Sequence, residues 1–395
     1  MIASGNVRAV LDSLQRRFAT GDVGSLPVIF GLVLIWAVFY LQNPLFLSPG
    51  NLTNLAGQIA PTGIVSVGIV LVLLLGEIDL SVGSVYGLGS AVMAVLSIQQ
   101  GWAAAPAIAA GVLVGTLIGT FQGFFFTRFR IPSFVVTLAG LLTWFGAQLH
   151  VLGEKGTINL SDPIIVSVAN QFYPASVGWT LAVIVVALLA VDLFIVRRRR
   201  TAAGLPLDGW ASAIAKFVVI AGVIFGAMAV LAADKGVPLS LLILLAFVVG
   251  FDLMLTRTRF GRHVFAVGGN AEAARRAGIS VNGIRIAVFA ICGTMAAFGG
   301  ILGASRLEAV NYSSGTGDTL LNAIAAAVIG GTSLFGGRGT VWSALTGGLV
   351  IGSINNGLAL LSAASDVKFM VTGGVLLAAV TIDAVARQGR QRAGV

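Results

Sequence analysis

Long stretches of apolar residues, separated by short polar gaps, dominate the chain. Twelve of these stretches are long enough to suggest helices that cross a bilayer, for which about 20 apolar residues suffice. They lie at residues 26–42, 57–75, 80–98, 103–126, 134–152, 177–196, 213–232, 238–255, 284–305, 320–334, 341–361 and 367–385. The tenth stretch is short, so we expect a broken or re-entrant helix there. The pattern predicts an all-α polytopic membrane protein with about 12 transmembrane helices, in the range 10–12.

The composition supports this fold class. Hydrophobic residues make up 57% of the 395 residues and charged residues only 10%, whereas a soluble domain carries about 25% charged residues. The charges are therefore too few to solvate a globular surface. The 52 glycines fit membrane helices that pack closely through small residues.

The basic residues lie mainly in the gaps between the apolar stretches and predict an orientation. With the N-terminus placed in the cytoplasm, 20 of the 24 Lys and Arg residues fall on the cytoplasmic side, as the positive-inside rule requires. We therefore expect both termini to be cytoplasmic. Because these residues share no soluble face, the net charge of +9 reflects topology, and we expect no nucleic-acid partner.

The apolar stretches leave little room for other domains. We predict one transmembrane domain over residues 1–395, with a cytoplasmic N-terminal segment at 1–25, a cytoplasmic loop at 256–283 and a cytoplasmic tail at 386–395. The first apolar stretch lacks a cleavage signal and is expected to remain as a span. The chain contains no Walker A pattern, so we expect it to bind no ATP in that way.

Two glycine-rich segments resemble each other. "GVLVGTLIGTFQGFFF" (Gly111 to Phe126) and "GGLVIGSINNGLALL" (Gly347 to Leu361) would run in opposite directions across the membrane in this topology. An inverted internal repeat, common in transporters, would produce this arrangement. Small-residue helix packing is the alternative explanation.

Two carboxylates interrupt one of the most apolar parts of the chain. Glu77 and Asp79 lie in "GEIDLS", which fills a very short gap between two predicted spans. Gly76 can end the first helix with left-handed torsions, Asp79 can cap the next helix, and Ser81 then lies in its first turn. The alternative is a carboxylate pair that couples transport to protons or cations. No His or Lys in a neighbouring apolar stretch offers a partner, which favours capping.

The cytoplasmic loop predicts a short helix of its own. Asn270 is a good N-cap, residues 271–277 are strong helix formers, and Gly278 is a natural stop. Glu272 lies in the first turn, and Arg275 and Arg276 suit the C-terminal end. Small residues and the absence of bulky apolar side chains favour a docking helix for a cytoplasmic partner over a helix that lies in the lipid headgroups.

The remaining motifs give weaker predictions. The glycine-rich "IGGTSLFGGRGTVWSALTGG" (Ile329 to Gly348) predicts a tight turn on the inner side. Asn355 and Asn356 in the eleventh span must form hydrogen bonds, either between helices or as the polar lining of a sugar path. His150 and His263 are isolated, so we expect no metal site, no cofactor and no catalytic residues.

The motifs together resemble a known family. "GEIDLSVGS", "IPSFVVTLAGL", "TRFGRHVFAVGGNAEAARRAGI", "AVIGGTSLFGGRGT" and "INNGL" are similar, in the same order, to the membrane permease of the ribose/xylose class of bacterial ABC sugar importers. Xylose-type permeases share the extra spans in residues 177–255 and a basic stretch like Arg197 to Arg200. Ribose-type members begin the first motif with two glycines, whereas this chain has Gly76-Glu77, as in the xylose-type branch.

The resemblance implies a mechanism and a set of partners. A second copy of the chain would complete the pore, an extracytoplasmic sugar-binding protein would deliver the sugar, and a cytoplasmic ABC ATPase subunit would drive alternating access. The chain would then lie in the bacterial cytoplasmic membrane, bind no cofactor and be no enzyme by itself. The family's coupling segment matches the short cytoplasmic helix, with its contacts expected at Asn270, Glu272, Ala273, Arg275, Arg276 and Gly278. The expected family-motif and pathway residues are Glu77, Asp79, Ser81, Asn355 and Asn356.

The sequence is also compatible with three other functions. A proton-coupled secondary sugar transporter would use Glu77 and Asp79. A membrane scaffold would transport nothing. The branched-chain amino-acid permeases are more distant members of the family, and would make the substrate an amino acid.

Overall fold

Every predicted apolar stretch contains a helix. The computed structural model describes residues 26–205, 207 and 209–392, so the predicted N-terminal segment 1–25 and the end of the tail at 393–395 lie outside the described residues. The helices in the twelve stretches are α2 (Leu26–Gln42), α3 (Pro49–Leu74), α4 (Val82–Ala94), α5 (Ala104–Phe129), α6 (Ser133–Leu152), α8 (Ala175–Ala202), α9 (Trp210–Ala232), α10 (Leu239–Arg257), α13 (Val281–Leu307), α14 (Thr319–Ile329), α15 (Trp342–Leu360) and α16 (Ser365–Arg392).

The all-α polytopic class is confirmed. Within the described residues, eight helices are long and apolar enough to cross a membrane. They are α3, α4 with its π-helical continuation η2 (Val95–Gln99), α5, α6, α8, α9, α10 and α13. The tenth predicted stretch forms the 11-residue helix α14, which is too short to span a bilayer alone.

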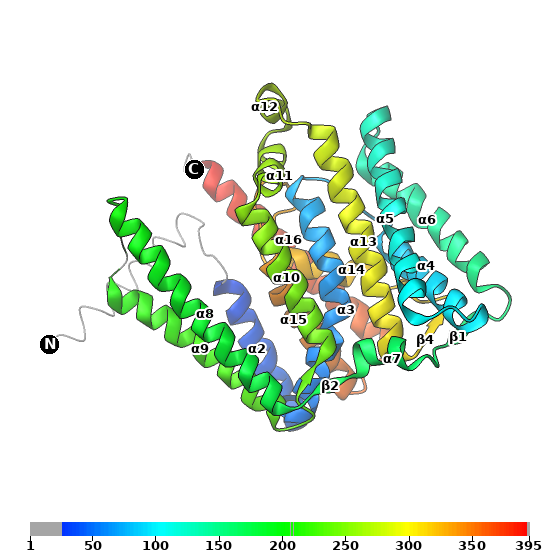
Figure 1. Cartoon of the computed structure of the whole chain (residues 1–395), viewed down its shortest axis with the longest axis horizontal. Helices are drawn as coiled ribbons and strands as arrows, with labels where there is room; N and C mark the ends of the chain where they lie inside the picture. The colour runs from blue at the N-terminus through cyan, green and yellow to red at the C-terminus, as the bar shows by residue number, and fades with distance from the viewer. Residues whose placement is uncertain (1–25, 206, 208, 393–395) are drawn as a thin grey trace.

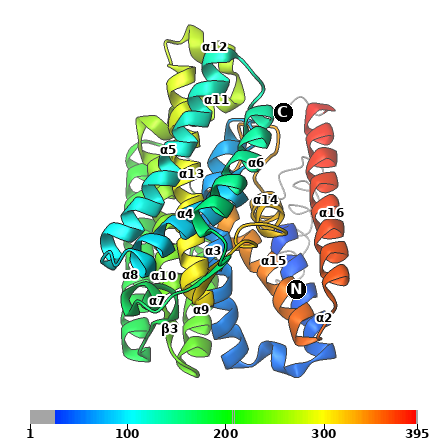
Figure 2. The ribbon, with the colours of Figure 1, turned by 90° about the vertical axis from the view of Figure 1, so that its right-hand side faces the viewer.

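The long helices α3 and α13 form the centre of the molecule (Figures 1 and 2). They pack against each other, and α5 lies along the other side of α13. Small residues permit this close approach: a Cβ atom added to Gly115 of α5 would collide with the backbone oxygen of Gly293 of α13. The hydroxyls of Thr116 and Thr294 hydrogen-bond across the same interface at 2.8 Å.

The two ends of the helical bundle differ. At one end, α11 (Arg259–Gly269) and α12 (Ala271–Arg276) project beyond the spans (Figure 2). At the other end, α7 (Pro163–Asn170) lies beside two short antiparallel strand pairs, which join residues far apart in sequence. The pairs are β1 (Thr157–Asn159) with β4 (Ala309–Asn311) and β2 (Phe172–Tyr173) with β3 (Val237–Pro238).

The hairpin of α8 and α9 stands at the periphery of the bundle (Figure 1). Its two helices pack mainly on each other, and their large apolar side chains are exposed, as Leu188 at 63% and Val219 at 65% illustrate. No described part of the chain covers these side chains.

Candidate functional site

The site begins at the break between α3 and α4. Leu74 is the last residue of α3, and Gly76 adopts a φ of +72°. This left-handed conformation ends the helix without the steric cost that a Cβ atom would bring. The predicted role of Gly76 is therefore confirmed.

The Asp79 side chain forms hydrogen bonds within the non-helical segment between α3 and α4. Its side chain is only 7% exposed, and its Oδ1 accepts hydrogen bonds from the backbone N–H of Ser81 at 2.9 Å and from the Ser81 hydroxyl at 2.7 Å. α4 begins only at Val82, with Ser81 at the N-cap, so the predicted N-cap role of Asp79 is wrong by two residues. The bond to Ser81 forms a local turn that precedes the helix instead.

Neighbouring helices complete the hydrogen bonding of this segment. Ser133 and Thr137 on α6 accept from the backbone N–H groups of Ile78 and Leu80, at 3.3 and 3.1 Å. Gln122 of α5 hydrogen-bonds to the Ser81 hydroxyl at 3.0 Å. The non-helical backbone at this depth is thus satisfied by side chains within the protein, as backbone away from water requires.

Glu77 has a partner that the sequence did not reveal. Its carboxylate lies 2.8 Å from the guanidinium of Arg285 on α13, and the two side chains are 15% and 26% exposed. The Arg285 guanidinium also lies 5.7 Å from the ring centroid of Phe126 on α5. A carboxylate that would be costly alone in an apolar environment is compensated by this pair. In the sequence, the position of Arg285 at the edge of the ninth apolar stretch hinted at a buried charge, but no role was predicted for its side chain.

Three glycine-bearing segments meet beside this ion pair. The backbone N–H of Gly337, in the loop between α14 and α15, donates to the carbonyl of Leu74 at 2.8 Å. A Cβ atom on Gly268, near the end of α11, would collide with the same carbonyl, and one on Gly336 would lie 2.9 Å from the Gly268 oxygen. We call Gly76, Gly268, Gly336 and Gly337 the glycine junction. It joins the end of α3, the end of α11 and the α14–α15 loop through direct backbone contacts.

The tight turn predicted between α14 and α15 is instead a longer glycine-rich loop. Gly331, Gly336, Gly337 and Gly339 all have positive φ, from +72° to +149°. The segment is longer than a tight hairpin turn, because α14 ends at Ile329 and α15 begins at Trp342. The extra length allows the loop to reach the end of α3.

The short helix α12 forms as predicted. The Asn270 side chain accepts from the N–H of Ala273 at 2.9 Å, and Gly278 ends the helix with a φ of +82°. Glu272 pairs with Arg275 at 2.6 Å and with Arg276 at 3.3 Å, all on the exposed surface. Ala273 is exposed, whereas Ala274 is buried and anchors the helix to the core. The helix therefore presents small and charged side chains at the end of the molecule.

The two asparagines of α15, Asn355 and Asn356, lie away from the break between α3 and α4. Asn356 forms two side-chain bonds with Asn51 of α3, at 2.8 and 3.0 Å, and approaches Gln58 at 3.5 Å. This contact joins α15 to the N-terminal half of α3, away from the Glu77 end. Asn355 is half-buried beside it. The geometry of Asn356 corresponds to a helix–helix hydrogen bond.

In the described part of the chain, no group of three or more His, Cys, Asp or Glu residues is placed to hold a metal ion. His150 is on α6 and His263 on α11.

The structure is a multi-pass helical bundle with close glycine-mediated helix packing, a break between α3 and α4 that holds two acids, and a short exposed helix, α12, at one end. The family model described as branched-chain amino acid transport system / permease component matches residues 51–380, and the chain belongs to this family.

Three similar proteins match the chain over at least 90% of its length. The chain is 36% identical to the xylose transport system permease protein XylH of Escherichia coli K12, over 91% of this chain and 92% of that protein. It is 33% identical to XylH of Haemophilus influenzae, over 90% and 95%. It is 32% identical to the ribose import permease protein RbsC of Escherichia coli K12, over 90% and 92%. No solved structure matches the chain.

Proposed function

We propose that this chain is the permease subunit of an ATP-binding-cassette importer that moves a monosaccharide, D-xylose, into the cytoplasm. The relatives with the higher identities are xylose permeases, and ribose permeases follow. A separate ATPase subunit supplies the energy, and this chain has no ATP site of its own. The observation that carries the proposal is the glycine junction, because it gives an exposed docking helix a direct mechanical connection to the broken helix.

The proposed orientation places α11 and α12 in the cytoplasm. The arginine-bearing ends of α5, α8 and α10 lie on the same side of the bundle as these helices. The positive-inside rule then places both termini in the cytoplasm as well, in the bacterial inner membrane. If α2, α14, α15 and α16 are added to the eight long apolar helices, the described residues provide 12 membrane helices, of which α14 is too short to span the bilayer alone.

The packing supports an inverted repeat of α3–α6 with α13–α16. α3 and α13 are the long central helices, and a short helix, α4 or α14, follows each after a break. α5 packs on α13 and α4, while α15 packs on α3 and α14. α6 contacts α4, and α16 contacts α14. The two similar segments, Gly111–Phe126 and Gly347–Leu361, occupy equivalent places on α5 and α15.

In this mechanism, the ATPase subunit contacts α12 through Asn270, Glu272, Ala273, Arg275, Arg276 and Gly278. A displacement of α11 and α12 acts on Leu74 through Gly268, and on Glu77 through Arg285 at the start of α13. The break at residues 75–81 then changes the access of the sugar path on one side of the membrane. The sugar-binding protein docks at the opposite end, at α7 and β1–β4, and a second copy of the chain completes the pore.

A purified complex tests the proposal. We expect D-xylose-loaded binding protein to stimulate ATP hydrolysis by the permease–ATPase complex at least severalfold, and ribose or leucine to stimulate it less. Stimulation by leucine but by neither sugar would indicate an amino-acid permease. The absence of any substrate-dependent hydrolysis would favour the scaffold.

A further inference from the structure

The proposed inverted repeat has a second helix break, between α13 and α14, which corresponds to the break between α3 and α4. The sequence is GEID at the first break and GTGD at the second, so an acid stands three residues after a glycine in each. Both glycines, Gly76 and Gly315, have positive φ, at +72° and +81°. The acids differ, because Asp79 is buried whereas Asp318 is exposed. In transporters built from inverted repeats, paired breaks of this kind mark the substrate site.

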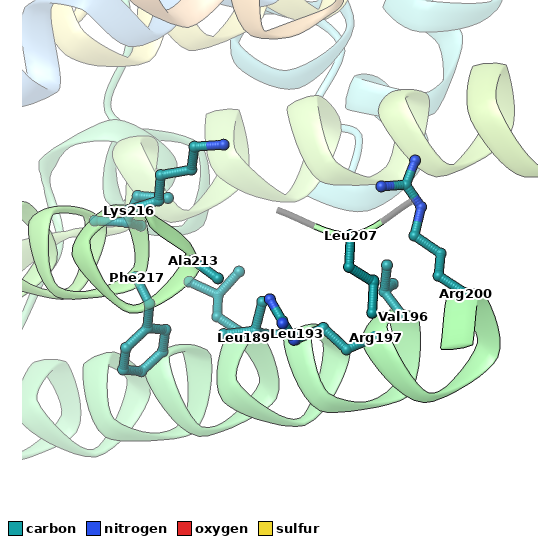
Figure 3. A pocket seen from close by; sticks show the side chains of 10 residues that line it. Leu189, Leu193, Val196, Arg197, Arg200, Leu207, Ala213, Lys216 and Phe217 are labelled. Atoms are coloured by element: carbon teal, nitrogen blue, oxygen red, sulfur yellow. The ribbon is translucent and has the colours of Figure 1, made fainter. Parts of the chain in front are cut away.

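The second break lies near the middle of the bundle. The Ser66 hydroxyl of α3 donates to the Ala323 carbonyl of α14 at 2.7 Å. Ser66 is eight residues, or about 12 Å, from the end of α3 at Leu74, in a helix of 26 residues that rises about 39 Å. Because the loop after α14 reaches Leu74, Asp318 lies on the far side of Ala323 from that end, about 7 Å beyond it. This location is separate from the cavity of the peripheral hairpin, whose walls come from α8, α9 and the segment between them (Figure 3).

Asn322 on α14 directs an unpartnered acceptor toward this break. Its Nδ2 donates to Oδ2 of Asp318 at 2.9 Å, which turns the amide toward the start of the helix. The Asn322 side chain is only 6% exposed, and its Oδ1 accepts no hydrogen bond from any described residue. Asp318 stands at the N-cap of α14 but forms no capping bond with its side chain. Because a buried acceptor without a donor is costly, a hydroxyl of a ligand is a suitable partner for Asn322.

Tyr86 of α4 and Arg306 of α13 approach the same region. A Cβ atom added to Gly303, one turn before Arg306, would collide with the Tyr86 hydroxyl, so this hydroxyl lies against α13. The charges of Arg306 and Asp318 both act on Tyr86. In the described part of the chain, no ion pair joins these two charges. A guanidinium and a carboxylate therefore lie near one phenol without neutralising each other directly.

We propose that Tyr86, Arg306, Asp318 and Asn322 form a contact site for the monosaccharide on its path through the permease. This inference rests on the proposed function and names the residues that recognise the sugar. Sugar hydroxyls donate to the Asp318 carboxylate and to Oδ1 of Asn322, and they accept from Arg306. A neutral polyol satisfies both charges at once, whereas a cation or an anion meets a like charge beside its partner. A zwitterionic amino acid also carries both charges, so leucine is the competitor in the test.

Saturation-transfer difference NMR of the purified full chain, in nanodiscs free of sugar-based detergent, tests this site. We expect millimolar D-xylose, but not leucine, to receive saturation from the wild-type protein. Asp318→Ala and Asn322→Leu should each reduce the D-xylose signal at least severalfold. The matched control is Asp366→Ala, which removes an exposed acid from the first turn of another helix, α16, and should leave the signal within about twofold of wild type. Because Asp318 is exposed, Asp318→Ala keeps the test valid if Asn322→Leu fails to fold.

The outcomes separate this site from the proposed function. Unchanged D-xylose signals in both site variants, an equal loss in Asp366→Ala, or saturation of leucine instead of D-xylose would overturn the site. A wild-type protein that gives no D-xylose signal, although sugar-loaded binding protein stimulates ATP hydrolysis by its complex, would overturn the site and leave the permease function intact. A D-xylose signal that the site variants lose, without any sugar-dependent hydrolysis, would support the site and contradict the ATP-driven function.

Discussion

Glu77 and Arg285 form an ion pair at 2.8 Å that joins the break after α3 to the first part of α13. Arg285 lies only seven residues after Gly278, which ends the exposed helix α12. The pair therefore connects the proposed docking helix to the segment that contains both acids of the motif. It also explains how Glu77 is accommodated in an apolar region.

The first prediction concerns the stability of this pair. Arg285→Ala should lower the free energy of unfolding by about 1–3 kcal/mol, because it leaves a mostly buried carboxylate without a partner. Glu77→Gln should cost less than Arg285→Ala, since it removes the acid itself. The control is Arg275→Ala, whose pair with Glu272 is exposed and should contribute less than about 1 kcal/mol. Thermal unfolding of the detergent-purified variants measures both effects, and equal losses in Arg285→Ala and Arg275→Ala would contradict the structure.

The second prediction uses two adjacent glycines of α11. A Cβ atom on Gly268 would meet the Leu74 carbonyl, whereas one on Gly269 meets nothing within 4 Å. We expect Gly268→Ala to destabilise the protein by about 1–3 kcal/mol and to impair sugar uptake, because the glycine junction must separate. Gly269→Ala should be neutral or slightly stabilising, since alanine is the better helix former. Indistinguishable unfolding temperatures for the two variants would argue against the junction.

The third prediction addresses the docking helix. Ala273→Trp places a bulky side chain on the exposed face of α12 and should abolish co-purification of the ATPase subunit, while membrane insertion remains normal. The matched control is Ala233→Trp, at an exposed position at the opposite end of the bundle. Affinity purification of the tagged permease measures the retained ATPase. A normal ATPase yield with Ala273→Trp would place the docking surface elsewhere.

The fourth prediction separates a structural from a proton-coupling role of Asp79. Asp79→Asn keeps the Oδ1 acceptor for Ser81, so ATP-driven uptake should remain within severalfold of wild type. Asp79→Ala removes that acceptor and should destabilise the protein by about 1–3 kcal/mol. Uptake assays and thermal unfolding of both variants provide the measurement. Loss of uptake in a stable Asp79→Asn protein would instead support the proton-coupled alternative.

Local features of the site could be predicted from the sequence. Gly76 and Gly278 were expected to end helices because glycine tolerates positive φ, and Asn270 was expected to cap α12 through its side chain. These features depend on residues within a few positions of each other. The N-cap of α4 was predicted wrongly, because two neighbouring polar residues, Asp79 and Ser81, were both suitable for that position.

Long-range features could not be predicted in the same way. Glu77 and Arg285 are more than 200 residues apart in sequence, and nothing local to either one specifies the other. The same holds for the glycine junction, in which Gly268 and Gly337 contact the end of α3. The glycine density of each segment was visible, but only the packing of the helices shows that the segments meet.

Uptake of D-xylose into proteoliposomes tests whether this chain is the permease of an ATP-driven sugar importer. We expect ATP-dependent accumulation only when the vesicles contain this chain together with its ATPase subunit and when the sugar-binding protein is present. Vesicles that contain this chain alone should not accumulate the sugar, with or without a proton gradient. Accumulation by the chain alone on a proton gradient would show that it is a secondary transporter instead.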